Sequence, residues 1–363
     1  MTTTTRAANA ANANGNGGAD ASDAKSDDYS KDMQAKMGTT LTYRHEQGIN
    51  WDAITPDVIV GSCLQTPADV DRLADEAGVT TVFCLQEDCD LEYFGIDVGA
   101  IAARCAERGD IRHVRFPIRD FDPFELRRLL PRAVARLALA HRPPGQPGSE
   151  GGSVYIHCTA GMGRAPAAAL AYMTWLRGWD LDHAYAHLRA SRACSPKVEA
   201  VRAATADLLL GADPLPVTVS LPRRGTVVDA RVAGLDVGWG TQLPMAPNPR
   251  AGGRLEVTRR LLPGRYPFKF VLDGAWAASL DYPTVRDGDS TNNVLEVLPR
   301  DEVSGEGKGA LTPEDAAKRA AQRDRLSVPG RGGLTDEERL ELSLLLCPWA
   351  THRKVDHLAS LDG

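Results

Sequence analysis

Hydrophobic residues follow two different patterns along this 363-residue chain. From Leu41 to about residue 210, short β-branched and apolar runs alternate with longer stretches whose apolar residues recur at helical spacing. This alternation of strands with helices predicts an α/β domain with a mainly parallel sheet flanked by helices. The predicted strands are 59–60, 80–85, 111–116 and 153–156, and the predicted helices are 67–77, 96–107, 124–140, 165–177, 180–190 and 196–210.

The pattern changes at Asp213-Pro214-Leu215-Pro216. Beyond this point, short apolar runs are separated by Gly and Pro turns, which is typical of an all-β, immunoglobulin-like sandwich. The chain is therefore expected to contain an α/β domain over residues 39–213 and a β-sandwich over residues 214–299. The predicted strands of the sandwich are 217–221, 227–232, 254–261, 266–272 and 294–298.

Both ends of the chain differ from these two domains. Residues 1–38 are rich in Thr, Ala, Asn, Gly and Asp without a hydrophobic period, which predicts a disordered leader. Its first 19 residues contain no acid and one arginine, so an organelle transit peptide and a plain tail are both open interpretations. Residues 300–333 are charged and Gly-rich, which indicates a linker. A capping box of Thr335 and Glu338 begins a helix over 334–347, which is expected to dock on the α/β domain through a face near Leu340, Leu344 and Leu345.

Charge and cysteine usage narrow the classes of partner. The net charge is −6, from 42 basic and 48 acidic residues, which argues against nucleic acid and anionic membranes as main partners. No apolar run reaches the roughly 18 residues of a membrane span. Seven cysteines without a CxxC pair indicate neither a disulfide framework nor a zinc ribbon. His183 and His187 have the helical spacing of zinc ligands, but no third ligand recurs nearby.

The stretch Val154–Pro166 carries the candidate chemistry. A strand-like run ends in His157 and Cys158, a glycine-rich loop of five residues follows, and Arg164 begins an alanine-rich helical run. The N-terminus of a helix favours an anion, and loop glycines allow successive backbone N–H groups to converge on it. Arg164 can hold two oxygens of that anion with its planar guanidinium. Because such a field stabilises a thiolate, Cys158 is predicted to attack phosphorus.

His-Cys-x5-Arg after a strand resembles the signature of the cysteine-dependent phosphatases. Most protein phosphatases of that superfamily have Ser or Thr after the arginine, whereas this chain has Ala165. The form Cys-Thr-Ala-Gly-Met-Gly-Arg-Ala-Pro instead resembles the plant starch-excess type of glucan phosphatase. The resemblance implies a cysteine-phosphatase fold that needs no metal or cofactor, with Cys158 and Arg164 as catalytic residues. It also implies a phosphate-binding loop that consists of His157, Thr159, Ala160, Gly161, Met162 and Gly163.

A phosphatase of this kind needs a carboxylic acid to protonate the leaving alkoxide. Ile118-Arg119-Asp120-Phe121-Asp122-Pro123 follows a predicted strand upstream of Cys158. By resemblance, Asp120 is the general acid. Asp122 precedes a proline at a helix start and is favoured as the N-cap of the helix from Phe124.

Aromatic residues lie in the predicted loops near this site. Tyr93, Phe94 and Phe121 match family positions that line a channel for an α-glucan chain, although packing in the core is the alternative for each. The family also has a phenylalanine where this chain has Ser195, so the channel is expected to have a different shape. Cys84 matches a cysteine that can pair with the nucleophile in the related plant enzymes, and an inert buried thiol is the alternative.

The β-sandwich has its own candidate sugar site. Trp239 lies in a glycine-rich loop, and Trp276 lies just past a turn. The alternation in Phe268-Lys269-Phe270 directs Lys269 to the opposite face from the two phenylalanines. These residues, with Asn292 and Asn293 before the last strand, resemble the glycogen-binding module of starch-active enzymes and kinase β-subunits. They are expected to bind glucan by stacking and hydrogen bonds, the alternative being that both tryptophans lie in the core.

Together these observations predict a monomeric phosphoglucan phosphatase that acts on starch-like α-glucan, such as amylopectin, in support of starch degradation. One alternative is a protein dual-specificity phosphatase directed to starch or glycogen by its β domain. A second is a glycan-binding scaffold without activity. The family implies a chloroplast or other plastid location, with the cytoplasm as the alternative.

Overall fold

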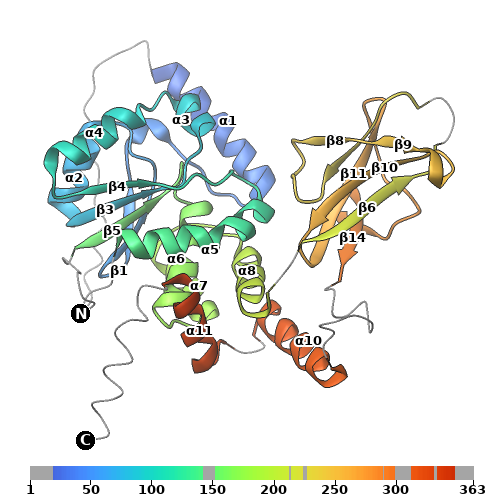
Figure 1. Ribbon diagram of the computed structural model, residues 1–363. Coiled ribbons are helices and arrows are strands. Elements are labelled where there is room, and N and C mark those ends of the chain that lie inside the picture. Colours follow the sequence, from blue (N-terminus) through green and yellow to red (C-terminus); the bar gives the residue numbers. More distant parts are fainter. Residues whose placement is uncertain are drawn as a thin grey trace, which may run out of the picture. The chain divides into compact units, whose positions relative to one another are not determined.

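The computed structural model describes residues 19–141, 152–211, 214–223, 227–288, 290–298, 312–330 and 333–347 (Figure 1). The chain divides into two compact units. The first is formed from the stretches Met1–Thr205 and Val328–Gly363, and the second from Ala206–Ser327. They correspond to the predicted α/β and β domains, although the division falls inside the helix Val198–Leu210.

Five strands form the sheet of the first unit in the order β1-β2-β5-β3-β4. Four of them are parallel, and β1 pairs antiparallel with β2 at one edge, so the predicted mainly parallel sheet is confirmed. β2 and β5 are buried along their whole length, as expected for apolar strands covered on both faces. The strands are β1 (Trp51–Thr55), β2 (Val58–Gly61), β3 (Val79–Cys84), β4 (Arg112–Arg115) and β5 (Ser153–His157).

Helices cover both faces of this sheet (Figure 1). Apolar residues of α2 and α4 join Val82 and Tyr155 in one buried cluster on the first face. α6 is buried from Arg164 to Trp175, because β2 and β5 lie against it and α5 and α7 pack on it as well. The helices are α2 (Pro67–Ala77), α3 (Asp88–Phe94), α4 (Val98–Arg108), α5 (Pro123–Ala140), α6 (Arg164–Leu176), α7 (Leu181–Ser191) and α8 (Val198–Leu210).

The first described segment is a helix, α1 (Ala19–Met37), so the prediction of disorder over residues 1–38 is wrong for this part. Met33 and Met37 are buried in the core, and Ser30 exchanges hydrogen bonds with the backbone of Tyr43. The apolar stripe consists of Tyr29, Met33 and Met37, one residue per turn among many polar ones. That stripe is too sparse to give a hydrophobic period. Residues 1–18 of the predicted leader lie outside the described residues.

The C-terminal part of the chain contains two helices. α10 (Pro313–Ser327) lies within the stretch predicted to be a linker, so that prediction is wrong for its residues. α11 (Asp336–Leu346) begins at the predicted capping box and packs on α5 and α6 of the first unit, which confirms its docking. The face is different from the predicted one, because Leu342 and Leu346 are buried while Leu340, Leu344 and Leu345 are exposed. Leucines occur on both sides of this helix, so the sequence pattern alone did not select the docking side.

The strands of the second unit, from Leu215 to Val297, pair antiparallel, which confirms the predicted all-β domain. One sheet has the order β6-β10-β9, and the other has the order β13-β14-β11-β7-β8 with β12 beside β11. Phe268 and Phe270 on β11 are buried in the core. The strands are β6 (Leu215–Leu221), β7 (Ala230–Gly234), β8 (Gln242–Pro244), β9 (Ala246–Asn248), β10 (Arg254–Leu261), β11 (Gly264–Leu272), β12 (Ala275–Ala277), β13 (Thr284–Asp287) and β14 (Ser290–Val297).

Candidate active site

The loop that contains Cys158 joins β5 to α6 at the carboxyl end of the parallel strands. The Cys158 side chain is buried, with 2% exposed, at the base of this loop. Gly161 has a φ of 67°, and a Cβ at this position would collide with the carbonyl group of Gly61. The turn therefore requires glycine, which explains the glycine in the middle of the motif.

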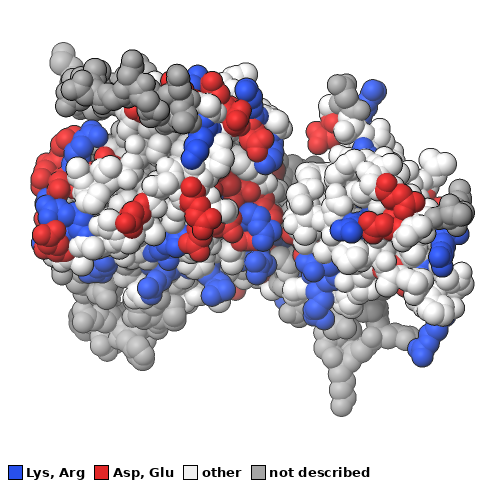
Figure 2. Space-filling model, turned by 90° about the horizontal axis from the view of Figure 1, so that it is seen from above, with Lys and Arg blue, Asp and Glu red and all other residues white. Residues whose placement is uncertain are grey.

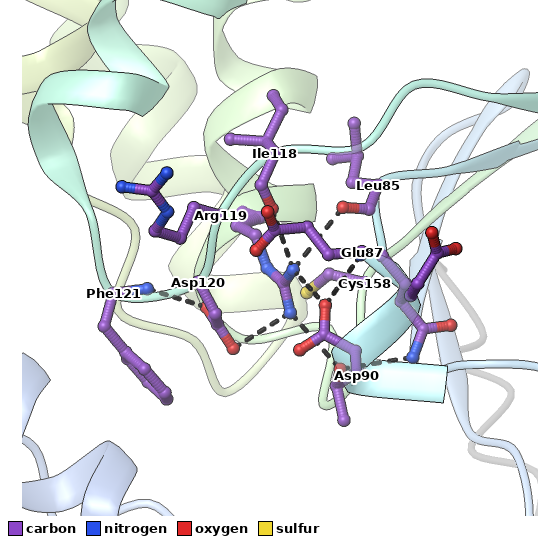
Figure 3. Close-up of polar contacts among 12 residues, drawn as sticks. Leu85, Glu87, Asp90, Ile118, Arg119, Asp120, Phe121 and Cys158 are labelled. Atoms are coloured by element: carbon purple, nitrogen blue, oxygen red, sulfur yellow. Dashed lines mark hydrogen bonds and ion pairs between the residues drawn. The ribbon is translucent and has the colours of Figure 1, made fainter. Parts of the chain in front are cut away.

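Arg164 is held by two carboxylates, both close to Cys158 (Figure 3). Its Nη1 donates to Asp90 Oδ2 at 2.6 Å and to the carbonyl of Ile118 at 2.9 Å. Its Nη2 lies 2.9 Å from Asp120 Oδ2. Burial disfavours the charge on Arg164, but the two carboxylates outweigh it and raise the pKa of the guanidinium well above its ordinary value. Arg164 Nε is buried and has no hydrogen-bond partner among the described residues.

The two candidate acids have different surroundings. Asp120 Oδ2 forms an ion pair with Arg164 and accepts a hydrogen bond from the phenol of Tyr29, which places this carboxyl group at the arginine. Asp122 is the N-cap of α5, where Oδ1 accepts from the backbone of Phe124 and Glu125. The geometry therefore brings Asp120 to the site and assigns Asp122 to the helix start, as predicted.

Several residues that the sequence analysis did not single out brace the loop. Arg192, which is 5% exposed, donates from Nε to the carbonyl of Gly161 at 2.8 Å and from Nη2 to that of Ala160 at 3.2 Å. Its other partners, Asp52 and Asn50, come from β1 and the segment before it. Local sequence carried no signal for this contact, because Arg192 follows α7, far along the chain from the loop.

The predicted aromatics lie at a cleft of about 400 Å³ in front of Asp120. Tyr93 and Phe94 belong to the helix α3, so their assignment to a loop is wrong. Tyr93 is 40% exposed, whereas Phe94 and Phe121 are half-buried. The cleft is lined by Asp28, Tyr29, Asp32, Glu87, Cys89, Asp90, Tyr93, Phe94, Arg119, Asp120 and Phe121.

Tyr29 of α1 connects this aromatic wall to the candidate acid. Its ring lies 5.7 Å from that of Phe94 and 6.0 Å from that of Phe121, measured between centroids. Its hydroxyl donates to Asp120 Oδ2 at 2.9 Å. Burial, followed by the charge of Asp120, raises the pKa of this phenol well above its ordinary value, so the hydroxyl keeps its proton. The sequence carries no signal for Tyr29, because the polar composition of residues 1–38 predicts disorder.

Ser195 and Cys84 both lie next to the phosphate loop. The backbone N–H of Ser195 donates to the carbonyl of Met162 at 2.8 Å, and the side chain is half-buried. Cys84 ends β3, in register with His157 on β5, and burial raises the pKa of its thiol to about 11. All seven cysteines are free thiols. A redox role for Cys84 stays a prediction.

In the second unit, Trp239 and Trp276 lie together, with ring centroids 6.3 Å apart. They are 41% and 48% exposed, which excludes the alternative that both are core residues. Lys269 is half-buried on the face of β11 opposite Phe268 and Phe270, as the alternation predicted.

Asn293 does not fit the predicted sugar site. It is fully buried, and its amide group bonds the backbone N–H and carbonyl of Ser279, so its assignment to glucan binding is wrong. A buried side chain whose amide group already forms hydrogen bonds within the domain cannot contact a polymer. Asn292 is 5% exposed, which leaves the two tryptophans and Lys269 as the accessible candidates.

Figure 2 shows acidic and basic side chains interspersed over the described surface seen in that view, in keeping with the net charge of −6. Among the described residues, no helix is long and apolar enough to cross a membrane.

The fold and site define a cysteine-dependent phosphatase with a carbohydrate-binding domain. Residues 67–202 match the family model of the dual specificity phosphatase catalytic domain, and residues 215–303 match that of the glycogen recognition site of AMP-activated protein kinase. The chain is 45% identical over 278 residues to the amyloplastic phosphoglucan phosphatase DSP4 of Castanea sativa, which covers 76% of this chain and 71% of the relative. The chain belongs to the phosphoglucan phosphatase family.

Two other relatives share part of this arrangement. The chloroplastic phosphoglucan phosphatase LSF1 of Arabidopsis thaliana is 30% identical over 278 residues, which is 75% of this chain and 45% of the relative. Laforin of Mus musculus is 26% identical over 156 residues, which is 40% of this chain and 45% of the relative.

Proposed function

We propose that this enzyme removes phosphate monoesters from starch-like α-glucan, such as amylopectin, through a phosphocysteine intermediate. The proposal rests on the ion pairs that Arg164, at the end of the Cys158 loop, makes with Asp90 and Asp120, because both carboxylates also line the aromatic cleft. A phosphate bound at Cys158 then lies beside a carboxyl group and below a surface onto which sugar rings can pack.

In the first step, the Cys158 sulfur attacks phosphorus and the bond from phosphorus to the glucosyl oxygen breaks. Asp120 gives its proton to the departing oxygen, so the glucan leaves as an alcohol. Arg164 and the loop amides hold the phosphoryl oxygens as negative charge develops on them. The contact between Arg164 and Asp120 supports this division of roles, because it places the acid next to the phosphate-binding group.

In the second step, a water attacks the phosphocysteine and gives its proton to the Asp120 carboxylate. The bond between sulfur and phosphorus breaks, and phosphate leaves with Cys158 restored as a thiolate. Ala165 is fully buried and has no hydroxyl group to assist the departing sulfur. Arg164 and the loop amides are therefore the groups proposed to stabilise this step.

We propose that the second unit keeps the enzyme on the polymer. Tethering a catalytic domain to an insoluble substrate raises the local concentration of that substrate. Trp239 and Trp276 support this role through their exposed, adjacent rings. The relatives named amyloplastic and chloroplastic support a plastid location, and we propose that the protein acts there as a monomer.

The test is phosphate release from solubilised phosphorylated amylopectin and from a phosphotyrosine peptide, with the wild type and with Cys158→Ser. Release from amylopectin should exceed release from the peptide and should vanish with Cys158→Ser. Turnover of the peptide alone would instead identify a protein phosphatase directed to starch. Activity that survives Cys158→Ser would overturn the mechanism.

A further inference from the structure

Cys84, His113 and His157 lie on one face of the central sheet, behind the phosphate loop. Cys84 on β3 is in register with His157 on β5, and Val82, two residues earlier on β3, is in register with His113 on β4. Residues in register point to the same face, and so do residues two apart on one strand. Their sulfur and ring nitrogen atoms lie within 4.8 Å of one another.

The surroundings of His157 leave one of its ring nitrogen atoms available to bind a metal ion. Its Nδ1 lies 3.2 Å from the backbone carbonyl of Cys158, an acceptor that places the ring proton on Nδ1. The lone pair then belongs to Nε2, which is buried and has no hydrogen-bond partner in the part of the chain that the structure describes. A histidine that ligates a metal usually donates its other N–H to a carbonyl or carboxylate in this way. Burial lowers the pKa of His157 to about 3, so the ring is neutral at physiological pH.

The other two side chains supply matching donors. Cys84 is 1% exposed, and His113 is half-buried with its pKa lowered, first by burial and then by the charge of Arg115. One thiolate and two neutral imidazoles form a ligand set that suits zinc and excludes magnesium and calcium, which prefer oxygen. Zinc bonds of about 2.0–2.3 Å require these donor atoms to approach by roughly an ångström, which side-chain rotation can supply.

We propose that Cys84, His113 and His157 form a binding site for one zinc ion. The Cys84 thiol gives up its proton to solvent as the bond from zinc to sulfur forms, so binding releases one proton and changes no oxidation state. The thiolate offsets one unit of the zinc charge, which matters because Arg164 lies close enough to affect His157. A bound ion would hold the ring whose Nδ1 faces the carbonyl of the nucleophile residue.

The test uses the full chain, stripped of metal and kept reduced, with Co²⁺ as an optical probe and Zn²⁺ in competition with a chromogenic chelator. One equivalent of Co²⁺ should bind with a thiolate-to-cobalt charge-transfer band. Cys84→Ser should abolish the band, and His113→Asn should weaken Zn²⁺ binding by more than about tenfold. His113 lies outside the proposed catalytic machinery, so activity of His113→Asn in metal-free buffer verifies that the variant folds.

Two matched controls exclude other ligands. Cys89→Ser removes an exposed thiol, and His183→Asn removes one histidine of the pair on α7 that has zinc-like spacing; both should bind as the wild type does. Absence of the charge-transfer band from the wild type would overturn the proposal. So would a band that persists in Cys84→Ser and disappears in Cys158→Ser, because the ion would then lie on the nucleophile.

Discussion

The aromatic cleft beside Asp120 and the tryptophan pair of the second unit are both proposed to contact glucan, but they are built in opposite ways. The cleft depends on buried charges from separate elements: Asp90 from α3, Asp120 from the segment after β4, and Arg164 from α6. The tryptophan pair depends on two exposed rings, Trp239 from the loop between β7 and β8 and Trp276 from β12. A reaction needs charges held in place in a site that excludes water, whereas binding a sugar chain needs accessible apolar faces.

The largest effect is expected at the acid, where Asp120→Asn removes the proton donor. The turnover number for amylopectin should fall by about 10²–10⁴-fold, the usual contribution of general acid catalysis. Asp122→Asn is the matched control, because Asn caps a helix about as well as Asp and the change leaves the acid in place. Steady-state kinetics and urea unfolding of both variants distinguish the two roles. A greater loss of turnover in Asp122→Asn would reverse the assignment.

The next effect is expected in the second unit, with Trp239→Ala and Trp276→Ala. Each should weaken binding to insoluble amylopectin by roughly 10- to 100-fold, because burying an aromatic side chain against the sugar on binding contributes about 1.5–3 kcal/mol. Hydrolysis of a small soluble aryl phosphate should be unchanged, because the cleft is intact. Sedimentation with amylopectin measures the binding, and Leu280→Ala, which truncates a fully exposed side chain, serves as control. A fall in aryl phosphate hydrolysis would contradict this separation of roles.

A smaller effect is expected for Tyr29→Phe, which retains the ring at the cleft and removes the hydrogen bond to Asp120. Loss of a hydrogen bond to a charged group costs about 1.5–3 kcal/mol, or roughly 10- to 150-fold. Turnover should fall by less than this, up to about tenfold, because Arg164 still contacts the carboxyl group. The KM for amylopectin should change little in this variant and should rise in Tyr29→Ala, which also loses the ring. An unchanged turnover number in Tyr29→Phe would show that α1 forms only a wall of the cleft.

The smallest effect concerns Asp57, a buried carboxylate outside the cleft. Burial raises its pKa, but contacts to His141, Arg177 and Thr55 outweigh burial and hold the pKa below its usual value. A depressed carboxyl pKa stabilises the fold above the unfolded value of about 3.9, and this contribution is lost as the pH falls toward the folded value. Asp57→Asn should therefore lower the free energy of unfolding at pH 7, and the difference should narrow from about pH 5 downward. Urea unfolding of the wild type and Asp57→Asn across this pH range measures the difference in free energy of unfolding. A difference that grows as the pH falls would contradict the lowered pKa of Asp57.

Local motifs were predicted well from the sequence, because the residues that form them are close together in the chain. The path from β5 through Cys158 to Arg164 is one such motif, since strand, turn and helix start are consecutive. The alternation around Lys269 and the capping box of Thr335 are others. In each case backbone geometry alone relates the residues, and it depends on spacing.

Contacts between distant segments could not be predicted in this way. Arg192 reaches the phosphate loop from the end of α7, and Tyr29 reaches Asp120 across 91 positions. Asn293 resembled a sugar-binding residue in the sequence, but in the structure its side-chain amide forms hydrogen bonds with the backbone of Ser279. The sequence by itself determined the α/β domain, the all-β domain and the path from β5 through the Cys158 loop to Arg164. Only the tertiary structure decided which charges surround that arginine and which helix closes the cleft, because those depend on packing between elements that no local pattern relates.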